Sequence, residues 1–594
     1  MNKRLPPRRL TVSRILMRAR RTIRNDQLIL AILAVAVGGL SAGAIILFRE
    51  AIALVQGLFY GTTSPRLIDH VMTLPWWWVL GAPTAGGLLV GLLFRFVIRR
   101  RRPSNVADVI AANAFRSGRM SLRRGLKTAL VDAVSIGVGA SVGREGPAVH
   151  LGAALGGWLA KTLRLTRMLA RTVMGCGVAA AVAASFNAPI AGALFANEVV
   201  IGHYGLSSFA PIVLASVVGT MASRAYFGDY PAFVIAQHPG VSLGEIPAFL
   251  VLGVLAAVAA IAFIRGTAAV QGRVQGLPGP AWLRPMVGGF LVGAIALVVP
   301  QVLGLGYGVT DDAMRGLLPL GVLAAAFVGK LLATILSHGF GFAGGVFSPS
   351  LVIGAMLGGT YGTLVTQLVP SLSSGADSYT VVGMGAVAAA VLGAPISTTL
   401  IIFEMTGDYA VTLAVMVAVV VSSVITKQVT GHSHFTFQLA RRGIDLKAGF
   451  EAALLRAIRV RDVMEQTCVT VTAGVHLPEI RARLIQSRVG EVFVVRGDGT
   501  LLGTITLQDL SEMAFDADCD DLITASDVAR LHPPMLPVNA DLHTALEAMR
   551  NAGEEHIAVV DSVDTGVLRG CVHERDVIAA YNRALVDSRR EEHE

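Results

Sequence analysis

Residues 187–198 read NAPIAGALFANE and residues 393–404 read GAPISTTLIIFE, so that Ala, Pro, Ile, Leu and Glu recur at the same places. Just upstream of each, residues 147–157 read PAVHLGAALGG and residues 349–359 read PSLVIGAMLGG. The second copies begin 206 and 202 residues after the first, so both pairs belong to one internal duplication. Two homologous halves in an apolar chain are typical of transporters whose site lies between the repeats. The sequence predicts such halves at about 27–225 and 245–436.

The composition divides the chain into a membrane part and a tail. Of the 594 residues, 53% are apolar and 15% are charged, whereas soluble domains average about a quarter charged. Apolar stretches broken by Gly and Pro fill residues 27–436, and charged residues return densely in the tail. Some stretches exceed a simple span of roughly 20 residues and others fall short. Uneven, interrupted helices predict an all-α polytopic transporter or channel rather than a simple anchor.

Positive charge gathers at the N-terminal segment, residues 1–26, and again at Arg99–Arg102. The positive-inside rule predicts that this end lies in the cytoplasm. A nucleic-acid-binding arm is the alternative, but the neighbouring membrane span already accounts for the charge. We therefore expect a cell (inner) membrane protein with cytoplasmic termini and no nucleic-acid partner.

Cysteine and histidine positions predict no metal site. The cysteines Cys176, Cys468, Cys519 and Cys571 stand far apart, and three of them in the tail fit a reducing compartment. His150, His338, His432 and His434 show no ligand spacing and are interpreted as packing or interfacial residues.

The segment Gly143–Pro147 reads GREGP and lies where one apolar stretch stops and another begins. Pro147 fits the first turn of a helix, and the free amides of a helix N-terminus attract anions. Glu145 is therefore anomalous, because an acid at membrane depth is costly and indicates function. Its carboxylate could occupy the place of an anion and leave when it is protonated or displaced. An ion pair with Arg144, or an interfacial loop position, is the structural alternative.

The second half supplies a matching break at Gly344–Pro349, which reads GGVFSP. The backbone amides of Val346 and Phe347 are candidates to face an anion. Two helix N-termini that converge from two halves would explain anion selectivity without a fixed cation. An ordinary glycine-rich helix break is the alternative, which the duplicated occurrence disfavours.

These motifs resemble those of the CLC family of chloride channels and chloride/proton antiporters, and so do NAP at 187–189, GAP at 393–395 and FEMTGDY at 403–409. The resemblance covers nearly the whole chain. It implies a homodimer with one pore per subunit, inverted halves and many tilted helices. It also implies that Glu145 is the gate and that chloride is bound by Ser104, Arg144, Gly146, Gly345, Val346, Phe347 and Phe435.

The chain departs from the family pattern at two anion-binding positions. Where the family usually has GSGIP, residues 103–107 read PSNVA, which keeps Ser104 as a hydroxyl donor but loses the flanking glycines. The position of a second hydroxyl, a Tyr in much of the family, is Phe435, which cannot donate.

Val199 bears on proton coupling. Antiporters of the family commonly carry an inner glutamate directly after the Glu of the NAP helix, and here Glu198 is followed by Val199. An apolar residue cannot relay a proton, so the sequence favours a passive chloride channel. A chloride/proton antiporter remains the alternative, because some antiporters manage without that glutamate. Glu198 itself is interpreted as structural, like its repeat partner Glu404.

The tail contains a second duplication, which resembles paired CBS domains at 458–515 and 523–585 after a linker at 437–457. Each unit reads strand, helix, strand, turn, strand, helix, with GDGT at 497–500 as a hairpin signal. A cytosolic α/β CBS pair is therefore expected. The segments 503–509 and 570–576 resemble the CBS pattern that holds an adenine nucleotide (ATP, ADP or AMP). Their candidate binding residues are Thr506, Asp509, His573 and Asp576, and a pair that only dimerises is the alternative.

Other classes of protein fit less well. An intramembrane hydrolase would need a nucleophile and base or an HExxH zinc pair, and no such pattern occurs, so no enzyme activity and no required cofactor are expected. A CBS-containing divalent-cation transporter would need several carboxylates in its pore. The acids of the membrane part are few and lie beside helix starts that favour anions. The sequence does not decide between chloride, fluoride and nitrate as the transported anion.

Overall fold

The computed structural model describes residues 26–98, 103–202, 205–229, 242–370, 373–444, 455–456, 458–487, 490–510 and 520–593. The chain forms two compact units, Met1–Leu446 and Lys447–Glu594. The basic N-terminal residues 1–25, the run Arg99–Arg102, Cys519 and residues 445–454 of the predicted linker lie outside the described residues.

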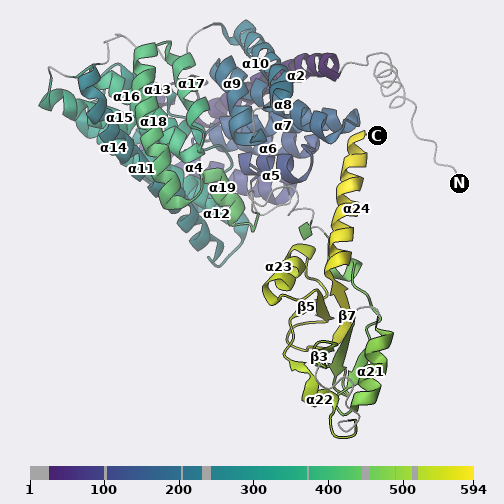
Figure 1. The fold of residues 1–594 in the computed structure, drawn as a ribbon. Coiled ribbons are helices and arrows are strands. Elements are labelled where there is room, and N and C mark those ends of the chain that lie inside the picture. Colours follow the sequence, from purple (N-terminus) through teal and green to yellow (C-terminus); the bar gives the residue numbers. More distant parts are fainter. Residues whose placement is uncertain are drawn as a thin grey trace. The chain divides into compact units, whose positions relative to one another are not determined.

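The first half of the membrane unit is a series of helices of very unequal length (Figure 1). Two of its elements, η1 and η2, are π-helical and continue the helices before them. The elements are α2 (Asp26–Tyr60), α3 (Leu67–Val71), α4 (Trp76–Leu93), η1 (Phe94–Ile98), α5 (Val106–Phe115), α6 (Leu122–Gly137), α7 (Glu145–Thr162), α8 (Arg167–Phe186), α9 (Pro189–Phe195), η2 (Ala196–Ile201) and α10 (Leu206–Phe227).

The second half repeats this alternation of long and short helices. Among the described residues of the whole chain, nine helices are long and apolar enough to cross a membrane. The elements of this half are η3 (Leu243–Glu245), α11 (Ile246–Gln275), η4 (Ala281–Leu283), α12 (Arg284–Val298), η5 (Pro300–Val302), α13 (Tyr307–Met314), α14 (Leu320–Phe340), α15 (Phe347–Leu368), α16 (Ala376–Leu392), α17 (Pro395–Thr406), α18 (Tyr409–Thr430) and α19 (His434–Ala440). Helix α19 crosses the predicted domain boundary at residue 436.

Close helix packing uses the same glycine pairs in both halves. A Cβ on Gly152 of α7 would lie 2.2 Å from the carbonyl oxygen of Gly177 in α8. In the second half, a Cβ on Gly354 of α15 would lie 2.3 Å from the carbonyl oxygen of Gly383 in α16. Small residues let helix backbones approach in this way inside a membrane. Helices α8 and α16 are consequently buried on nearly every side.

The NAP and GAP motifs are helix junctions. Asn187 and Gly393 end α8 and α16 in the left-handed conformation, with φ of 59° and 69°. Asn and Gly tolerate that conformation best, and the proline two residues later suits the first position of the next helix. One helix therefore ends at each motif, and the next helix begins two residues later. The helices that begin there, α9 and α17, are short.

Each half supplies a carboxylate that accepts hydrogen bonds from a helix start of the other half. Glu404, in α17, accepts the N–H groups of Ile190 and Ala191 in α9 at 2.9 and 2.7 Å. Glu198 accepts the N–H groups of Ile396 and Ser397 in α17 at 3.1 and 2.7 Å. Each half thus satisfies the other's unpaired helix donors. This reciprocity is that of two halves related by a two-fold axis, and the predicted fold class of inverted repeats is confirmed.

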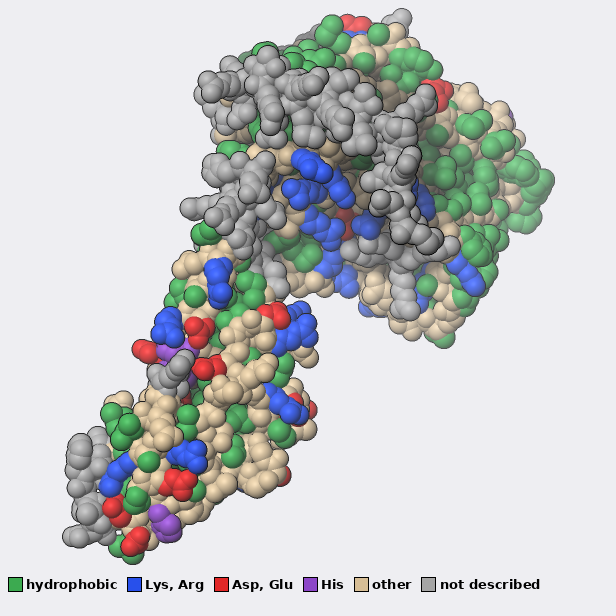
Figure 2. Space-filling model, turned by 90° about the vertical axis from the view of Figure 1, so that its right-hand side faces the viewer, with side chains coloured by type: hydrophobic (Ala, Val, Ile, Leu, Met, Phe, Trp, Pro, Cys, Tyr) green, Lys and Arg blue, Asp and Glu red, His purple; other side chains and the backbone are tan. Residues whose placement is uncertain are grey.

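The outer surface of the membrane unit is apolar. Large side chains such as Leu47, Leu58 and Val298 are 72%, 73% and 84% exposed. Figure 2 shows hydrophobic side chains covering one flank of this unit, beside an area where Lys and Arg side chains gather. A broad apolar flank beside a charged area is the surface of a protein that lies in a bilayer.

The second unit, whose strands and helices Figure 1 draws, contains two small sheets that each include a strand, helix, strand, strand unit, and the first sheet has β4 (Arg530–Leu531) as a fourth strand beside β3 (Leu501–Thr506). In each sheet the first two strands are parallel and the next pair is antiparallel. The predicted order of elements is therefore present, and the last helix predicted for the first CBS repeat lies beyond residue 510, largely outside the described residues. The elements are η6 (Val460–Asp462), β1 (Thr470–Thr472), α21 (Leu477–Gln486), β2 (Glu491–Val495), β3 (Leu501–Thr506), α22 (Ala525–Val528), β4 (Arg530–Leu531), β5 (Met535–Pro537), α23 (Leu542–Ala552), β6 (His556–Val560), β7 (Leu568–His573) and α24 (Glu574–His593).

The reciprocal carboxylates should matter for stability. We expect Glu404→Ala to lower the free energy of unfolding of the detergent-solubilised protein by roughly 2 kcal/mol, because two hydrogen bonds to a charged group are lost. Glu198→Ala should cost about the same, and Glu50→Ala, at an exposed position of α2, should change it little. Unfolding in mixed micelles of SDS measures the difference. A Glu404→Ala protein as stable as Glu50→Ala would contradict this role.

Candidate anion pathway

Two loops, one from each half, are joined where α7 and α15 begin. The Gly143 N–H donates to the Gly345 carbonyl at 2.7 Å, and the Gly345 N–H donates to the Gly143 carbonyl at 2.6 Å. A Cβ on Gly146 would lie 2.7 Å from the Gly345 Cα, so only glycine permits this approach. The two motifs singled out in the sequence therefore lie side by side, and Glu145 faces the first turn of α15.

The carboxylate of Glu145 is bound at the N-terminus of α15. Its Oε1 atom accepts the Tyr307 hydroxyl at 2.7 Å and the Ser348 hydroxyl at 2.5 Å, and its Oε2 atom accepts the Ser348 N–H at 3.3 Å. The residue is 2% exposed. A negative charge at a helix N-terminus is favourable, so the carboxylate occupies a position that suits an anion.

Four helices contribute residues of their starts to one small cavity beside Glu145. The volume of this cavity is about 10 Å³, which is close to the least space that one water molecule needs. Helix N-termini carry partial positive charge that a low-dielectric surrounding strengthens. The lining residues are Val106 of α5, Glu145, Gly146 and Val149 of α7, Val346 and Phe347 at the start of α15, Phe435 of α19, and the apolar Val182, Phe186, Phe195 and Leu392.

Five of the predicted site residues meet at this cavity: Glu145, Gly146, Val346, Phe347 and Phe435. The others lie close by with different contacts. Arg144 donates to the Ser185 carbonyl at 3.2 Å, and its Nε atom lies 3.6 Å from Oε1 of Glu145. Gly345 makes the pairing with Gly143 described above. Ser104 is nearly buried and borders a separate recess rather than the cavity.

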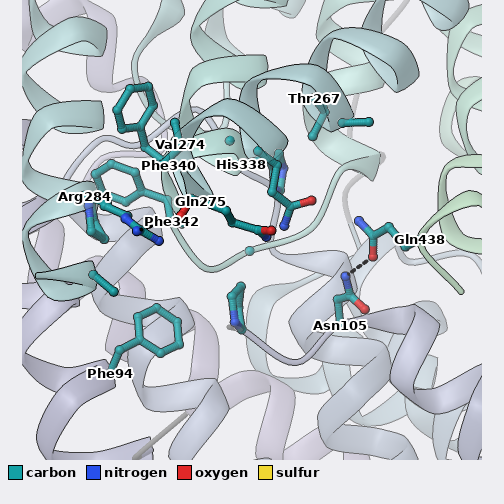
Figure 3. A pocket seen from close by; sticks show the side chains of 18 of the residues that line it. Phe94, Asn105, Thr267, Val274, Gln275, Arg284, His338, Phe340, Phe342 and Gln438 are labelled. Atoms are coloured by element: carbon teal, nitrogen blue, oxygen red, sulfur yellow. Dashed lines mark hydrogen bonds between the residues drawn. The ribbon is translucent and has the colours of Figure 1, made fainter. Parts of the chain in front are cut away.

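The altered loop before α5 is held by a helix cap. The Asn105 side chain accepts the Ala107 N–H at 3.1 Å, and the Asp108 side chain accepts the Asn105 N–H at 3.0 Å. This capping box compensates for the missing glycines by satisfying the helix start with side chains. The Asn105 amide also donates to Gln438 of α19 at 2.5 Å. Figure 3 shows this bond at the edge of a cavity of about 650 Å³ that His338, Arg284 and several Phe side chains also line.

The recess on which Ser104 lies is basic. Its volume is about 800 Å³, and its lining includes one acid, Asp108, and the buried His150. A cavity lined by one sign of charge concentrates ions of the opposite sign. The basic residues of the lining are Arg116, Arg119, Arg123, Arg124 and Lys161.

Val199 lies in the π-helical segment η2 and is half-buried. Its neighbour Glu198 is held by the start of α17. The side chain at position 199 offers no acceptor for a proton, as the sequence predicts.

The nucleotide candidates of the tail gather where the two sheets meet. Glu491 pairs with Thr506 across one sheet, and His556 pairs with His573 across the other. Oδ2 of Asp509 accepts both the Thr506 N–H and its hydroxyl at 2.7 Å. The Glu491 carboxylate lies 3.7 Å from the His556 ring, which links the two sheets. Asp576 follows in the first turn of α24.

Burial disfavours the charged form of both partners in the Glu491–His556 contact. Desolvation, and then the neighbouring Glu554, raises the pKa of Glu491 to about 7, although Arg530 acts in the opposite direction. Desolvation, and then the neighbouring His573, lowers the pKa of His556. The protonated form of Glu491 is uncharged and would repel a bound phosphate less than the carboxylate does.

Comparison with known families matches both units. The model described as "Voltage gated chloride channel" matches residues 86–427, and the CBS domain model matches residues 460–515 and 525–583. The chain belongs to the voltage-gated chloride channel (CLC) family.

Relatives in this family cover the membrane unit. A protein described as "Putative chloride channel protein ClcB-like" from Ralstonia nicotianae is 35% identical over 401 residues, which cover 67% of this chain and 92% of that protein. The "Voltage-gated ClC-type chloride channel ClcB" of Escherichia coli (strain SMS-3-5 / SECEC) is 31% identical over 403 residues, which cover 67% of this chain and 95% of that protein.

Solved structures of the family share the fold. A slow cyanobacterial Cl⁻/H⁺ antiporter has a TM-score of 0.63 at 23% identity, over 70% of this chain and 97% of its own. A eukaryotic CLC transporter has a TM-score of 0.61 at 20% identity and covers 92% of this chain and 98% of its own. The second alignment therefore extends beyond the membrane unit into the tail.

Three residues of this CLC site were not predicted. Ser348 is part of the GGVFSP motif, and a hydroxyl directly after Phe347 at a helix start could have indicated it. Asn105, a helix cap, follows Ser104 directly. Tyr307 lies about 40 residues before the motif that it meets, and no local pattern connects the two.

Phe435 offers a test of the cavity. We expect Phe435→Tyr to lower the Kd for chloride by about threefold to tenfold, because the added hydroxyl supplies one neutral hydrogen bond in an apolar lining. Phe437→Tyr, on the same helix but lining the larger cavity of Figure 3, is the matched control. Isothermal titration of the detergent-solubilised protein measures both. Equal affinities for the two variants would contradict the assignment of this cavity to the anion.

Proposed function

We propose that this protein is a passive chloride channel of the cell membrane whose pore is gated by Glu145. It works as a homodimer with one pore in each subunit and with cytoplasmic N- and C-termini. The observation that carries the proposal is the bound state of Glu145: its carboxylate lies on the α15 donors that would otherwise hold an anion. The described ClcB relatives are named as chloride channels, which supports chloride as the ion.

The anion route begins in the basic recess at Ser104. Its five positive side chains raise the local concentration of chloride, and the buried Ser104 hydroxyl offers the first uncharged donor. Beyond Val106 the ion loses its water against the helix N-termini at the cavity. Donors that hold chloride there must be weak enough to release it, and uncharged backbone amides meet that need.

The gate acts because the Glu145 carboxylate and chloride compete for the same donors at the start of α15. When Glu145 is charged, its carboxylate occupies the outer end of the route and an anion cannot pass. Protonation from outside removes the charge, and a competing anion displaces the carboxylate. In both cases the donors at the start of α15 become free for chloride.

The competing function is chloride/proton antiport. Two of the similar solved structures are described as Cl⁻/H⁺ and fluoride/proton antiporters, each under 25% identical to this chain. Val199 supports the channel instead, because an apolar side chain there cannot pass a proton to Glu145.

The reversal potential of the protein in liposomes tests both parts. Under a fixed chloride gradient, we expect the potential to equal the chloride value whether or not a pH gradient is present. Glu145→Gln should conduct with no dependence on external pH, since it mimics the protonated gate. Val199→Ala, which leaves the position apolar, is the matched control and should behave as the wild type.

Each part can fail separately. A reversal potential that moves with the pH gradient would make the protein an exchanger whose proton path bypasses Val199. Wild-type pH dependence in Glu145→Gln would remove Glu145 from the gate.

We also propose that the CBS pair binds an adenine nucleotide, ATP, ADP or AMP, between Thr506 and Asp509 on one sheet and His573 and Asp576 on the other. The cross-strand pairs and the Glu491–His556 contact support this, because they bring the two candidate sets to one place. We expect Asp509→Ala to weaken binding of ATP to the full-length protein about tenfold, as loss of a charged hydrogen bond does. Asp564→Ala, in an exposed turn, is the control. Equal affinities measured by calorimetry would contradict the site.

A further inference from the structure

The closest partners of the gate carboxylate are side-chain hydroxyls rather than backbone amides. The Tyr307 and Ser348 hydroxyls lie 2.7 and 2.5 Å from Oε1 of Glu145, whereas the Ser348 N–H lies 3.3 Å from Oε2. The two hydroxyl oxygens are also 3.1 Å apart. They thus form a small receptor in which both donors point at the same carboxylate oxygen.

Tyr307 is placed in this receptor by a fixed loop. It is the first residue of α13 and follows the turn at Gly304–Gly306. Lys330 of α14, which is 1% exposed, donates to the carbonyls of Val302 and Gly304 at 2.9 and 2.7 Å. The Gly304 N–H donates in turn to the Gly139 carbonyl at 3.0 Å, between α6 and α7.

The buried amine of Lys330 is informative because its burial is costly. A buried amine is costly in an apolar interior unless acceptors compensate it, as the two carbonyls do here, whereas an apolar side chain of the same length would need no partners. Lys330 fixes the loop that leads into Tyr307, because its two hydrogen bonds join this loop before α13 to α14.

Charged groups around the receptor favour the ionised carboxylate. Arg144, the N-cap of α7, places Nε 3.6 Å from Oε1 of Glu145 and its guanidinium carbon 4.9 Å from the centre of the Tyr307 ring. Arg49 of α2 interacts electrostatically with both Arg144 and Tyr307. The Arg144 guanidinium and two hydroxyls therefore lie beside the Glu145 carboxylate.

We propose that Tyr307 and Ser348 form a latch that holds the Glu145 carboxylate in the closed gate, and that Lys330 is the positioning residue of this latch. The inference rests on the proposed gate. The latch determines how readily the gate opens: each lost hydroxyl makes the charged, blocking carboxylate less favourable relative to the protonated, displaced one. The pore then opens at a higher external pH.

Tyr307→Phe tests the latch, because it removes the hydroxyl and keeps the ring that packs against Arg144. In chloride efflux from proteoliposomes, we expect the pH of half-maximal transport to rise by about one unit, since one hydrogen bond to a charged group changes an equilibrium roughly tenfold or more. Ser348→Ala should shift it in the same direction. Tyr379→Phe is the matched control, because the hydroxyl of this buried tyrosine has no hydrogen-bond partner within the described structure.

The role of Lys330 is tested by a double-mutant cycle. Lys330→Met should raise the half-maximal pH by itself, and the double variant with Tyr307→Phe should show no further shift, since both changes act on one contact. A Lys330→Met shift that adds in full to that of Tyr307→Phe would overturn the positioning role. Should Lys330→Met fail to insert, Lys330→Arg, which keeps a donor, decides the same point by retaining the wild-type pH profile.

Glu145→Gln separates the latch from the gate. If Glu145→Gln is independent of pH and Tyr307→Phe has the wild-type profile, the gate stands and the latch is overturned. If Glu145→Gln keeps the wild-type profile, the proposed gate fails and the latch with it. In the Glu145→Gln background, Tyr307→Phe should leave the flat profile flat, and a pH dependence that appears there would also overturn the latch.

Discussion

The two backbone hydrogen bonds between Gly143 and Gly345 are the constraint on which the rest of the membrane unit depends. They join loops from opposite halves and so force α7 and α15 to begin at one place, deep in a low-dielectric interior. Unpaired N–H groups of helix starts cannot be left there without a partner. Such a place must hold an anion or a side chain that acts as one, and Glu145 fills it here.

Helices α9 and α17 also begin inside the protein with backbone N–H groups that need acceptors, and there the acceptors are carboxylates of the other half. Glu404 and Glu198 each accept two backbone N–H groups at 2.7–3.1 Å from the helix of the other half. These two carboxylates satisfy the helix starts that they meet and hold the halves together. Glu145 accepts one longer amide bond and two hydroxyl bonds instead. In the proposed gate, this difference lets the Glu145 carboxylate leave the start of α15 more readily than Glu404 and Glu198 leave theirs, because it gives up one long amide bond rather than two short ones.

In the proposed gating mechanism, the small cavity and the apolar residues around it correspond to a closed pore. A volume of about 10 Å³ has no room for a chloride ion beside the carboxylate. Opening in that mechanism requires the Glu145 side chain to leave and the neighbouring Phe and Val side chains to adjust. The glycine pairs of α7 with α8 and of α15 with α16 pack these helices closely against each other. The proposed mechanism therefore assigns selectivity to the backbone of the helix starts and gating to one side chain.

The sequence by itself determined the duplication that contains NAP and GAP, the division into membrane unit and CBS pair, and the anomaly of Glu145, whereas the helix ends at Asn187 and Gly393 came from the structure. The sequence features follow from local patterns: hydropathy, the recurrence of motifs, and proline at a helix start. It also pointed to Gly146, Val346 and Phe347, because a motif at a helix N-terminus carries its chemistry within a few residues.

Only the tertiary structure decided what Glu145 touches. Tyr307, Ser348 and the buried Lys330 come from three different elements, and their roles depend on how the chain folds back between α12 and α15. The same is true of the Asn105 cap that replaces the missing glycines and of the meeting of Glu491 with His556. A hydrogen bond between residues far apart in sequence leaves no local pattern, because its geometry is set by the packing of whole helices rather than by the residues beside it.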